Sequence, residues 1–317
     1  MLLILTNSVD STSDEVVRRI GAGRVFRLNI DQWRQYRLVI DRDGFEISDP
    51  SGRSIRESKV RACYLRKPTF DDPIDIPASG SPEAWTRSEV GAVIGEIYGM
   101  CRSRGLVRLV EKGAGIRVGK LQQLRAAERF FRVPRWQYHW GDAVRGFPER
   151  AVAKPLGADF VQDWRFFFTS EVVPAELDIG FPWFVQERID ASHDETVVYV
   201  DGTIFAFRLD RGTISGIDWR RDIFSRALEW RRQPQDGAFE SAVRGFMESA
   251  GLAFGRLDFL VRNGERVFLE VNPNGQWGWL DLEGREGIFD RVVQALTQGW
   301  AHEERLATEA APRDDFA

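Results

Sequence analysis

The first third of the chain alternates short apolar segments with polar stretches. Residues 2–6 are apolar up to Thr6 and predict a buried strand, residues 15–20 have helical spacing, and residues 24–28 predict a second strand. A strand, a helix and a strand in this order indicate a small α/β domain at the N-terminus.

The pattern then predicts a hairpin, a strand and a long helix. Residues 36–40 and 45–47 alternate in polarity around an Asp-Gly pair, which is a hairpin signal. Residues 60–66 predict another strand, and residues 82–104 have the spacing of one amphipathic helix.

A second unit is expected to begin near Leu106. Helical spacing recurs over 118–130, 238–250 and 287–300, and strands are expected over 134–138, 150–155, 165–169, 183–189, 196–209, 255–261 and 266–272. Asn263-Gly264 is the strongest hairpin signal in the chain. We therefore expect an N-terminal domain over 1–105, a second unit over 106–301, and a polar tail over 302–317 that is disordered.

Composition narrows the class of protein. With 317 residues, 43% hydrophobic and 29% charged, the chain has the composition of a folded globular protein. A net charge of −4 provides no basic field for nucleic acid or an anionic membrane, and no apolar run is long enough to cross a bilayer. Two cysteines exclude a disulfide framework, and the start of the chain lacks the features of a signal peptide, so we expect a cytoplasmic protein.

Lysine is rare among the basic residues. Only five of the 44 are lysines, namely Lys59, Lys67, Lys112, Lys120 and Lys154. A lysine in such an arginine-rich chain hints at a position that needs a compact ammonium group. Lys154 lies within an apolar strand segment, where an ammonium group needs an anion.

The segments around Asn263-Gly264 bring acidic side chains together. Asp258 and Glu270 fall on neighbouring antiparallel strands, and Asn272 lies two residues after Glu270 on the same face. Carboxylate and amide oxygens are the ligands that Mg²⁺ prefers. The alternative is the solvated face of an edge hairpin, but the apolar residues on both strands favour a metal site.

This hairpin carries a family resemblance. Phe-Leu-Glu-Val-Asn-Pro-Asn-Gly-Gln-Trp-Gly-Trp-Leu at 268–280 resembles the metal-binding strand of ATP-grasp ligases. Its Gln-Trp-Gly-Trp extension is similar to the branch that matures graspetides, which are microviridin-type peptides cross-linked by ω-esters or ω-amides. Further motifs in the same order are Tyr-Leu-Arg-Lys-Pro at 64–68, Val-Gly-Lys-Leu-Gln-Gln-Leu at 118–124 and Asp-Trp-Arg at 218–220.

The resemblance implies a fold and a set of site residues. The fold is α/β, an ATP-grasp fold with an N-terminal pre-ATP-grasp domain, and ATP and Mg²⁺ are the implied cofactors. The implied roles are phosphate contacts for Lys120 and Lys154, adenine contacts for Glu187 and Ile189, a ribose contact for Glu195, catalytic phosphate contacts for Arg208 or Arg220, and metal binding by Asp258, Glu270 and Asn272. The alternatives of a solvated helix residue for Lys120 and a charged strand residue for Glu195 remain open.

Two positions depart from the family pattern. Many relatives have an arginine where this chain has Val197, and the loop that covers the phosphates is usually rich in glycine, whereas residues 157–164 contain one glycine. Both departures leave room for a module that only binds peptide or nucleotide.

The resemblance also implies an activity. The expected enzyme activates Asp or Glu side-chain carboxylates of a ribosomal precursor peptide as acyl phosphates and joins them to a Ser or Thr hydroxyl or a Lys amine. The partner is that peptide, with its leader and core, and we expect a homodimer that binds neither nucleic acid nor membrane. The enzyme alternative is a RimK-like ligase acting on free amino acids or a protein terminus.

Overall fold

A computed structural model describes residues 1–70, 77–109, 119–147, 150–156, 160–161, 165–166, 168–223, 225 and 228–300. These residues divide into two compact units. The first contains the described residues up to 109 together with 281–300, and the second contains those from 119 to 280.

The first unit is built on a parallel sheet. Its strand order is β2-β1-β6, from β1 (Leu2–Thr6), β2 (Val25–Asn29) and β6 (Ala62–Leu65). Alternate side chains such as Leu3, Leu5 and Phe26 share a core with the long helix α2 (Pro82–Ser103). The antiparallel sheet of β3 (Arg37–Asp41), β4 (Gly44–Ser48) and β5 (Ser54–Arg56) contributes to the same core.

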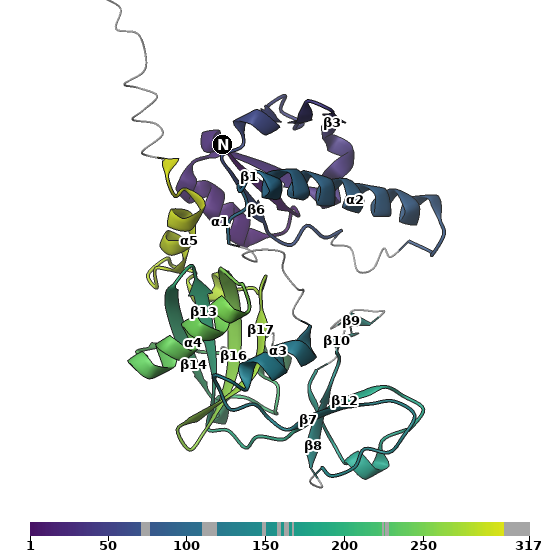
Figure 1. Ribbon diagram of the computed structural model, residues 1–317, viewed down its shortest axis with the longest axis vertical. Helices are drawn as coiled ribbons and strands as arrows, with labels where there is room; N and C mark the ends of the chain where they lie inside the picture. The colour runs from purple at the N-terminus through teal and green to yellow at the C-terminus, as the bar shows by residue number, and fades with distance from the viewer. Residues whose placement is uncertain are drawn as a thin grey trace, which may run out of the picture. The chain divides into compact units, whose positions relative to one another are not determined.

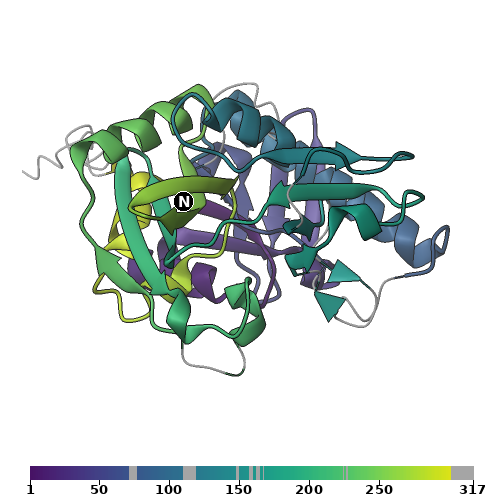
Figure 2. The same ribbon diagram turned by 90° about the horizontal axis from the view of Figure 1, so that it is seen from below.

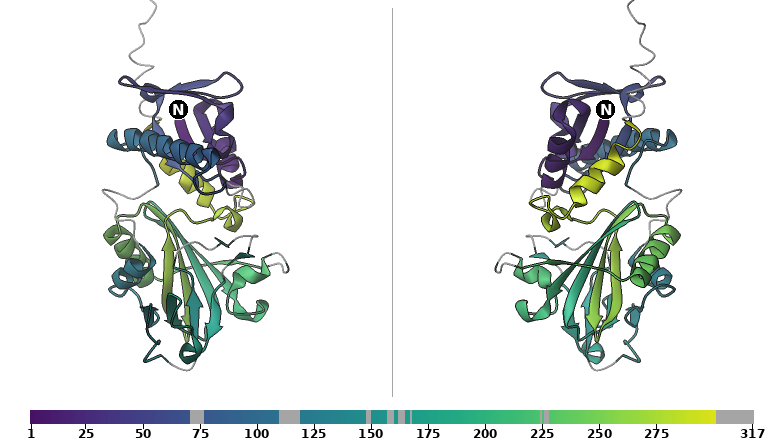
Figure 3. Two further views of the ribbon diagram at one scale, coloured as in Figure 1. Left: turned by 90° about the vertical axis from the view of Figure 1, so that its right-hand side faces the viewer. Right: turned by 90° about the vertical axis from the view of Figure 1, so that its left-hand side faces the viewer.

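The chain returns to the first unit at its C-terminal end. Helix α5 (Ile288–Leu296, yellow in Figures 1 and 3) packs beside α1 (Ser11–Ile20). The Arg19 guanidinium lies 5.1 Å from the centre of the Phe289 ring, and Trp300 is held between Arg24 and Arg61 at 4.9 and 4.8 Å. These contacts attach residues 281–300 to the N-terminal segment, whereas we expected the second unit to extend to residue 301.

The second unit contains a five-stranded antiparallel sheet in the order β15-β14-β13-β16-β17. Its strands are β13 (His193–Val200), β14 (Thr203–Asp210), β15 (Arg231–Gln233), β16 (Phe254–Arg262) and β17 (Glu265–Asn272). Helices α3 (Lys120–Ala127) and α4 (Gly237–Ser249) cover one face of this sheet (Figure 3). The core between them is rich in phenylalanine, and the other face of the sheet is left for a site.

A smaller sheet lies beside it in the same unit, drawn in teal in Figure 2. Its order is β11-β8-β12-β7, from β7 (Trp136–His139), β8 (Ala151–Lys154), β11 (Ser170–Val172) and β12 (Trp183–Glu187). A further pair is β9 (Phe160–Val161) with β10 (Arg165–Phe166).

Most predicted elements are confirmed. Two turns of the large sheet, Asp201-Gly202 and the expected Asn263-Gly264, have left-handed backbone at both central residues. The start of α1 was predicted wrongly, because the helix begins at Ser11 and not at residue 15. The tail over 302–317 and most of the loop over 157–164 lie outside the described residues, and no helix in the described part of the chain has the length and apolarity needed to cross a membrane.

Candidate active site

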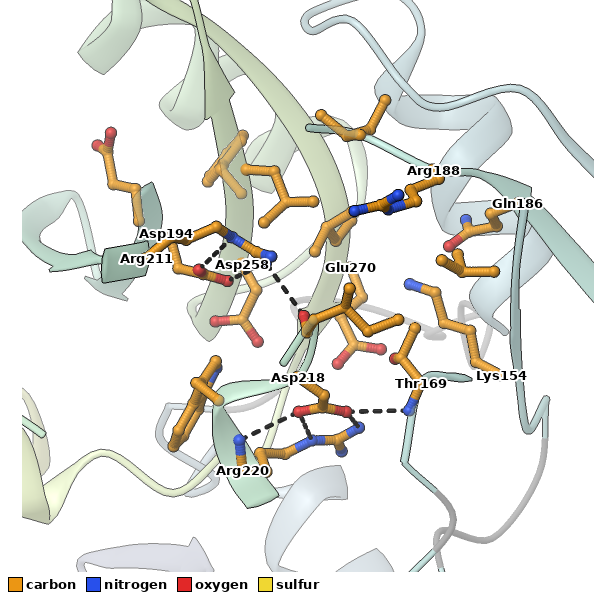
Figure 4. Close-up of a pocket in the computed structure, with 18 of the residues that line it drawn as sticks. Lys154, Thr169, Gln186, Arg188, Asp194, Arg211, Asp218, Arg220, Asp258 and Glu270 are labelled. Atoms are coloured by element: carbon orange, nitrogen blue, oxygen red, sulfur yellow. Dashed lines mark hydrogen bonds and ion pairs between the residues drawn. The ribbon is translucent and has the colours of Figure 1, made fainter. Parts of the chain in front are cut away.

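A cavity opens between the two sheets of the second unit (Figure 4). Strands β8 and β12 of the small sheet form one side, and strands β13, β16 and β17 of the large sheet form the other. Residues 211–220, which follow β14, supply the remaining wall. The cavity therefore collects side chains from segments far apart in the sequence.

An acidic pair lies on the large sheet. Asp258 on β16 is directly opposite Glu270 on β17, and the register shifts immediately after Asp258. Thr196 Oγ1 donates a hydrogen bond to Asp258 Oδ1 at 2.7 Å, and Arg256 Nη2 donates to Oδ2 at 2.9 Å. Two carboxylates this close repel each other unless a cation or a proton lies between or beside them.

Two lysines approach this acidic pair. Lys120, at the first turn of α3, donates from Nζ to the Pro155 carbonyl at 3.1 Å and lies 3.9 Å from Glu270 Oε2. Lys154 ends β8 and extends into the cavity. Burial lowers the pKa of Lys154, and the charge of Glu270 opposes this effect. Both ammonium groups therefore border the same acidic centre.

The end of β12 provides a different surface. Ile189 packs with Leu260 and Leu269 in an apolar group. Gln186 is 1% exposed and lines the cavity, and both polar atoms of its amide are buried without a hydrogen-bond partner among the described residues. A buried amide without a hydrogen-bond partner is unfavourable. The Gln186 amide is therefore suited to hydrogen-bond a polar ligand that lies against the apolar group around Ile189.

Two buried acids lie at the start of β13. Arg211 Nε is 2.9 Å from Asp194 Oδ2, and burial raises the pKa of Asp194 to about 6 against the effect of this arginine. Arg266 Nε donates to Glu195 Oε2 at 2.9 Å, and burial again raises the pKa of the carboxyl.

Asp218 holds the wall formed by residues 211–220 against the small sheet. It accepts hydrogen bonds from the backbone of Thr169 at 3.0 Å and from Arg220 Nη2 at 2.7 Å. Burial alone would raise the pKa of Asp218, but the hydrogen bonds and charge of Arg220 outweigh it and leave the pKa below its usual value. The Arg220 guanidinium is thereby fixed at the edge of the cavity.

Comparison with known proteins identifies the architecture. No family model matches the chain, and no curated protein matches it. Among solved structures, macrocyclase MdnC from Microcystis aeruginosa, bound with precursor peptide MdnA, matches with a TM-score of 0.76 at 22% identity, covering 94% of this chain and 99% of that one. A RiPP-associated ATP-grasp ligase from Chryseobacterium gregarium, in complex with ADP and a leader and core peptide, matches with a TM-score of 0.72 at 19% identity, covering 98% and 97%.

The chain has the ATP-grasp fold. D-alanine–D-alanine ligase from Bacillus anthracis, complexed with ATP, also matches, with a TM-score of 0.50 at 13% identity over 97% of this chain and 98% of that one. The predicted α/β class and ATP-grasp fold are therefore confirmed.

Most residues predicted for the site lie together in the ATP-grasp cavity. Eight of the ten line it, namely Lys120, Lys154, Glu187, Ile189, Glu195, Arg220, Asp258 and Glu270. The other two are not among its lining residues. Arg208 contacts Asp210, and Asn272 is exposed, with its Oδ1 accepting a hydrogen bond from the Asn274 backbone.

One departure from the family pattern lies in the apolar core. We expected the phosphate contact of the relatives' arginine to be missing or supplied by Arg208 or Arg220. Val197, at that position, is fully buried with Leu257 and Phe259. The preceding residue, Thr196, is the one that contacts Asp258. An arginine at 197 would have to enter this apolar core.

The cavity also contains residues that the sequence did not single out. They include Gln186, Arg188, Asp194, Arg211, Trp230 and Arg256. A glutamine inside the apolar run of β12 was the only local signal among them. The others depend on the approach of separate strands.

The fold implies ATP and Mg²⁺, and the side chains fit both. The Asp258 and Glu270 pair provides hard oxygen ligands, and the Gln186 amide and two lysines offer partners for a polar anionic molecule. Among the described residues, no cluster of three His, Cys, Asp or Glu side chains is placed to hold a metal, so two carboxylates are the most that such side chains supply.

Proposed function

We propose that this protein is an ATP-dependent ligase that activates side-chain carboxylates of a ribosomal precursor peptide and closes rings with a hydroxyl or an amine of the same peptide. The observation that carries the proposal is the direct pairing of Asp258 with Glu270 in a cavity that also contains Lys120 and Lys154. The fold is shared with a macrocyclase and with a RiPP-associated ligase.

The proposed nucleotide position follows from the two ends of the cavity. The apolar group around Ile189 and the free amide of Gln186 suit an adenine ring, with the backbone around Glu187 reading its edge. The ammonium groups of Lys120 and Lys154 suit the phosphates. Glu195 remains the proposed ribose contact, and it would have to share its carboxylate with Arg266.

Asp258 and Glu270 would hold magnesium, with Asn272 as a third ligand after a change of its present hydrogen bond. Bound there, the metal would offset charge that develops on the transferring phosphoryl group. Thr196 and Arg256 would fix the orientation of Asp258.

The chain's own residues would then position the reaction. A substrate carboxylate attacks the γ-phosphoryl group of ATP and releases ADP, and the hydroxyl or amine displaces phosphate from the acyl carbon. Arg220, fixed by Asp218, is placed to steady the anionic groups, while Arg208 would first have to leave Asp210. No protein nucleophile is required, because positioning and charge stabilisation carry this chemistry.

The proposal extends to location, assembly and peptide binding. We expect a cytoplasmic homodimer, and we expect the leader of the peptide to bind apart from its reacting core. Analytical ultracentrifugation measures the oligomeric state directly.

A reconstitution experiment tests the proposal. The protein is incubated with ATP, Mg²⁺ and the short peptide encoded beside its gene, chosen for its Ser, Thr or Lys and Asp or Glu residues. We expect stepwise loss of water by mass spectrometry, and methanolysis then opens esters and leaves amides. Joining of free amino acids without peptide dehydration would favour a RimK-like ligase, and ATP binding without turnover would favour a binding module.

A further inference from the structure

Three tryptophans form a cluster at the edge of the cavity. Trp219 begins the 3-10 turn η7 (Trp219–Asp222), Trp230 precedes β15, and Trp279 lies in the 3-10 turn η8 (Gly278–Leu280). Their ring centres are 5.4, 5.5 and 5.7 Å apart, with interplanar angles of 77°, 64° and 45°. Rings this close fill the space between them, so the cluster is a wall and not an open cage for a cation. We call Trp219, Trp230 and Trp279 the indole wall.

The turn after β17 holds Trp279 in place. A Cβ atom at Gly275 would lie 3.1 Å from Arg256 Cβ and 3.3 Å from Asn272 Cβ, so a larger residue would require its neighbours to shift by a few tenths of an ångström. Arg256 Nη1 donates to the Gln276 carbonyl at 3.0 Å. Trp277 is fully buried and faces Phe254, with ring centres 6.4 Å apart. Trp277 is therefore an anchor, and Trp279 is the indole that the turn presents.

The indole wall borders the charged part of the cavity. Trp219 and Trp230 line the cavity, and Trp219 lies between Asp218 and Arg220 in the chain. The charges of both neighbours act on Lys154, and both line the cavity together with Glu270 (Figure 4). The cavity has one apolar surface around Ile189, after the end of β12. The indole wall is a second apolar surface, and it borders the cavity that contains the acidic pair.

We propose that the indole wall keeps water from the activated carboxyl group, so that the peptide's own hydroxyl or amine reacts instead. This inference rests on the proposed ligase function. The unwanted reaction is hydrolysis of the acyl phosphate. A water oxygen attacks the acyl carbon, the carbon–oxygen bond to phosphate breaks, and phosphate leaves with the electron pair. The carboxylate re-forms and a proton is released. ATP is then consumed without a cross-link. Exclusion of water from a reactive intermediate is a known role of closed active sites.

The coupling of phosphate release to cross-linking tests the inference. Trp219→Gln, Trp230→Gln and Trp279→Gln introduce polar groups into the wall, and Trp279→Phe keeps it apolar. Trp140→Leu is the matched control, because Trp140 is 79% exposed and does not line the cavity. Each variant receives ATP, Mg²⁺ and the peptide encoded beside the gene. Phosphate released and water lost by the peptide are measured together, and thermal melting checks that each variant folds.

We expect the glutamine variants to release more than about twice as much phosphate per cross-link as the wild type, with ATP affinity unchanged. Trp279→Phe and Trp140→Leu should keep the wild-type ratio. An unchanged ratio in folded glutamine variants would overturn the inference while leaving the ligase function intact. Weaker ATP binding with an unchanged ratio would assign the wall to the nucleotide and also overturn it. A wild-type protein that never dehydrates the peptide would overturn the proposed function itself, and the inference with it.

Discussion

At the scale of single residues, the cavity is balanced in charge. Of the side chains that the structure describes, six acidic and six basic ones line it, namely Glu187, Asp194, Glu195, Asp218, Asp258 and Glu270 against Lys120, Lys154, Arg188, Arg211, Arg220 and Arg256. Most are held by neighbours of opposite charge, as Asp218 is by Arg220 and Asp194 by Arg211. Because burial of an unpaired charge is costly, this balance of charge lets many ionised side chains share one cavity.

Lys154 gives a prediction about phosphate binding. Lys154→Met keeps the length of the side chain and removes its charge. We expect the free energy of ATP binding to weaken by about 1–3 kcal/mol, the cost of losing a charged hydrogen bond. Isothermal titration with ATP and Mg²⁺ measures it, and Lys59→Met, an exposed lysine of the first unit, is the control. Equal affinities for both variants would make Lys154 a structural residue.

Asp194 gives a prediction about pH. Its pKa is raised by burial from 3.8 to about 6, so the folded state binds its proton more tightly than the unfolded state does. The stability that this group contributes is therefore present at pH values below 3.8 and is lost as the pH rises through about 6. We expect Asp194→Asn to lose less stability than the wild type over this window.

Urea unfolding at a series of pH values measures the difference between the two proteins. The slopes due to other carboxyl groups cancel in that difference, because the asparagine of Asp194→Asn stands in for the neutral carboxyl at every pH. Parallel stability curves over the window would contradict the raised pKa.

The residues that the sequence predicted best are those fixed by local geometry. The two-residue turn sets the register of their hairpin as far as Phe259 and Phe268, and the shift between Asp258 and Phe259 then places Glu270, and not Leu269, opposite Asp258. Gln186, Asp194 and Arg256 were missed because their place in the cavity depends on strands that meet only in the folded unit.

At the scale of elements, hairpins were predictable and polar helix starts were not. Residues 11–14 read as a polar loop, yet they begin α1, because Asp10 Oδ2 accepts hydrogen bonds from Thr6 Oγ1 and Ser13 Oγ. This buried polar cluster compensates for the missing apolar residues, and hydrophobic spacing cannot reveal it.

The contact of α4 with the large sheet gives a prediction at this scale. A Cβ atom at Gly255 would lie 2.8 Å from Val271 Cγ2 and 3.0 Å from Met247 Cε of α4. A larger residue at 255 would therefore clash with the side chains that pack between α4 and the sheet. We expect Gly255→Ala to lower the free energy of unfolding by about 1–3 kcal/mol through overpacking.

Urea unfolding measures this change, with Gly91→Ala as the control. Gly91 lies on α2 with no atom within 4 Å of the added Cβ, so alanine there should stabilise the helix by about 0.5–1 kcal/mol. The same sign of effect at both glycines would show that packing under α4 is not the cause.

At the scale of the whole molecule, the sequence predicted two units but not where the chain returns. Arg19 and Asp290 form an ion pair although they are 271 residues apart. A pattern of apolar spacing marks α5 as a helix, but it does not say which core receives it. The fold class could be predicted because the long motif at 268–280 resembles the metal-binding strand of ATP-grasp ligases and the turn that follows it. The shorter motifs elsewhere in the chain are weak signals on their own.

The central claim is that a peptide carboxylate attacks ATP in the cavity of the second unit. The most direct measurement uses the peptide encoded beside the gene with its Asp and Glu carboxylates enriched in heavy oxygen. We expect each cross-link to transfer one labelled oxygen to inorganic phosphate and to form one ADP, and we expect Glu270→Ala to form neither. Cross-linked peptide accompanied by unlabelled phosphate, or by AMP, would show that the carboxylate does not attack the γ-phosphoryl group.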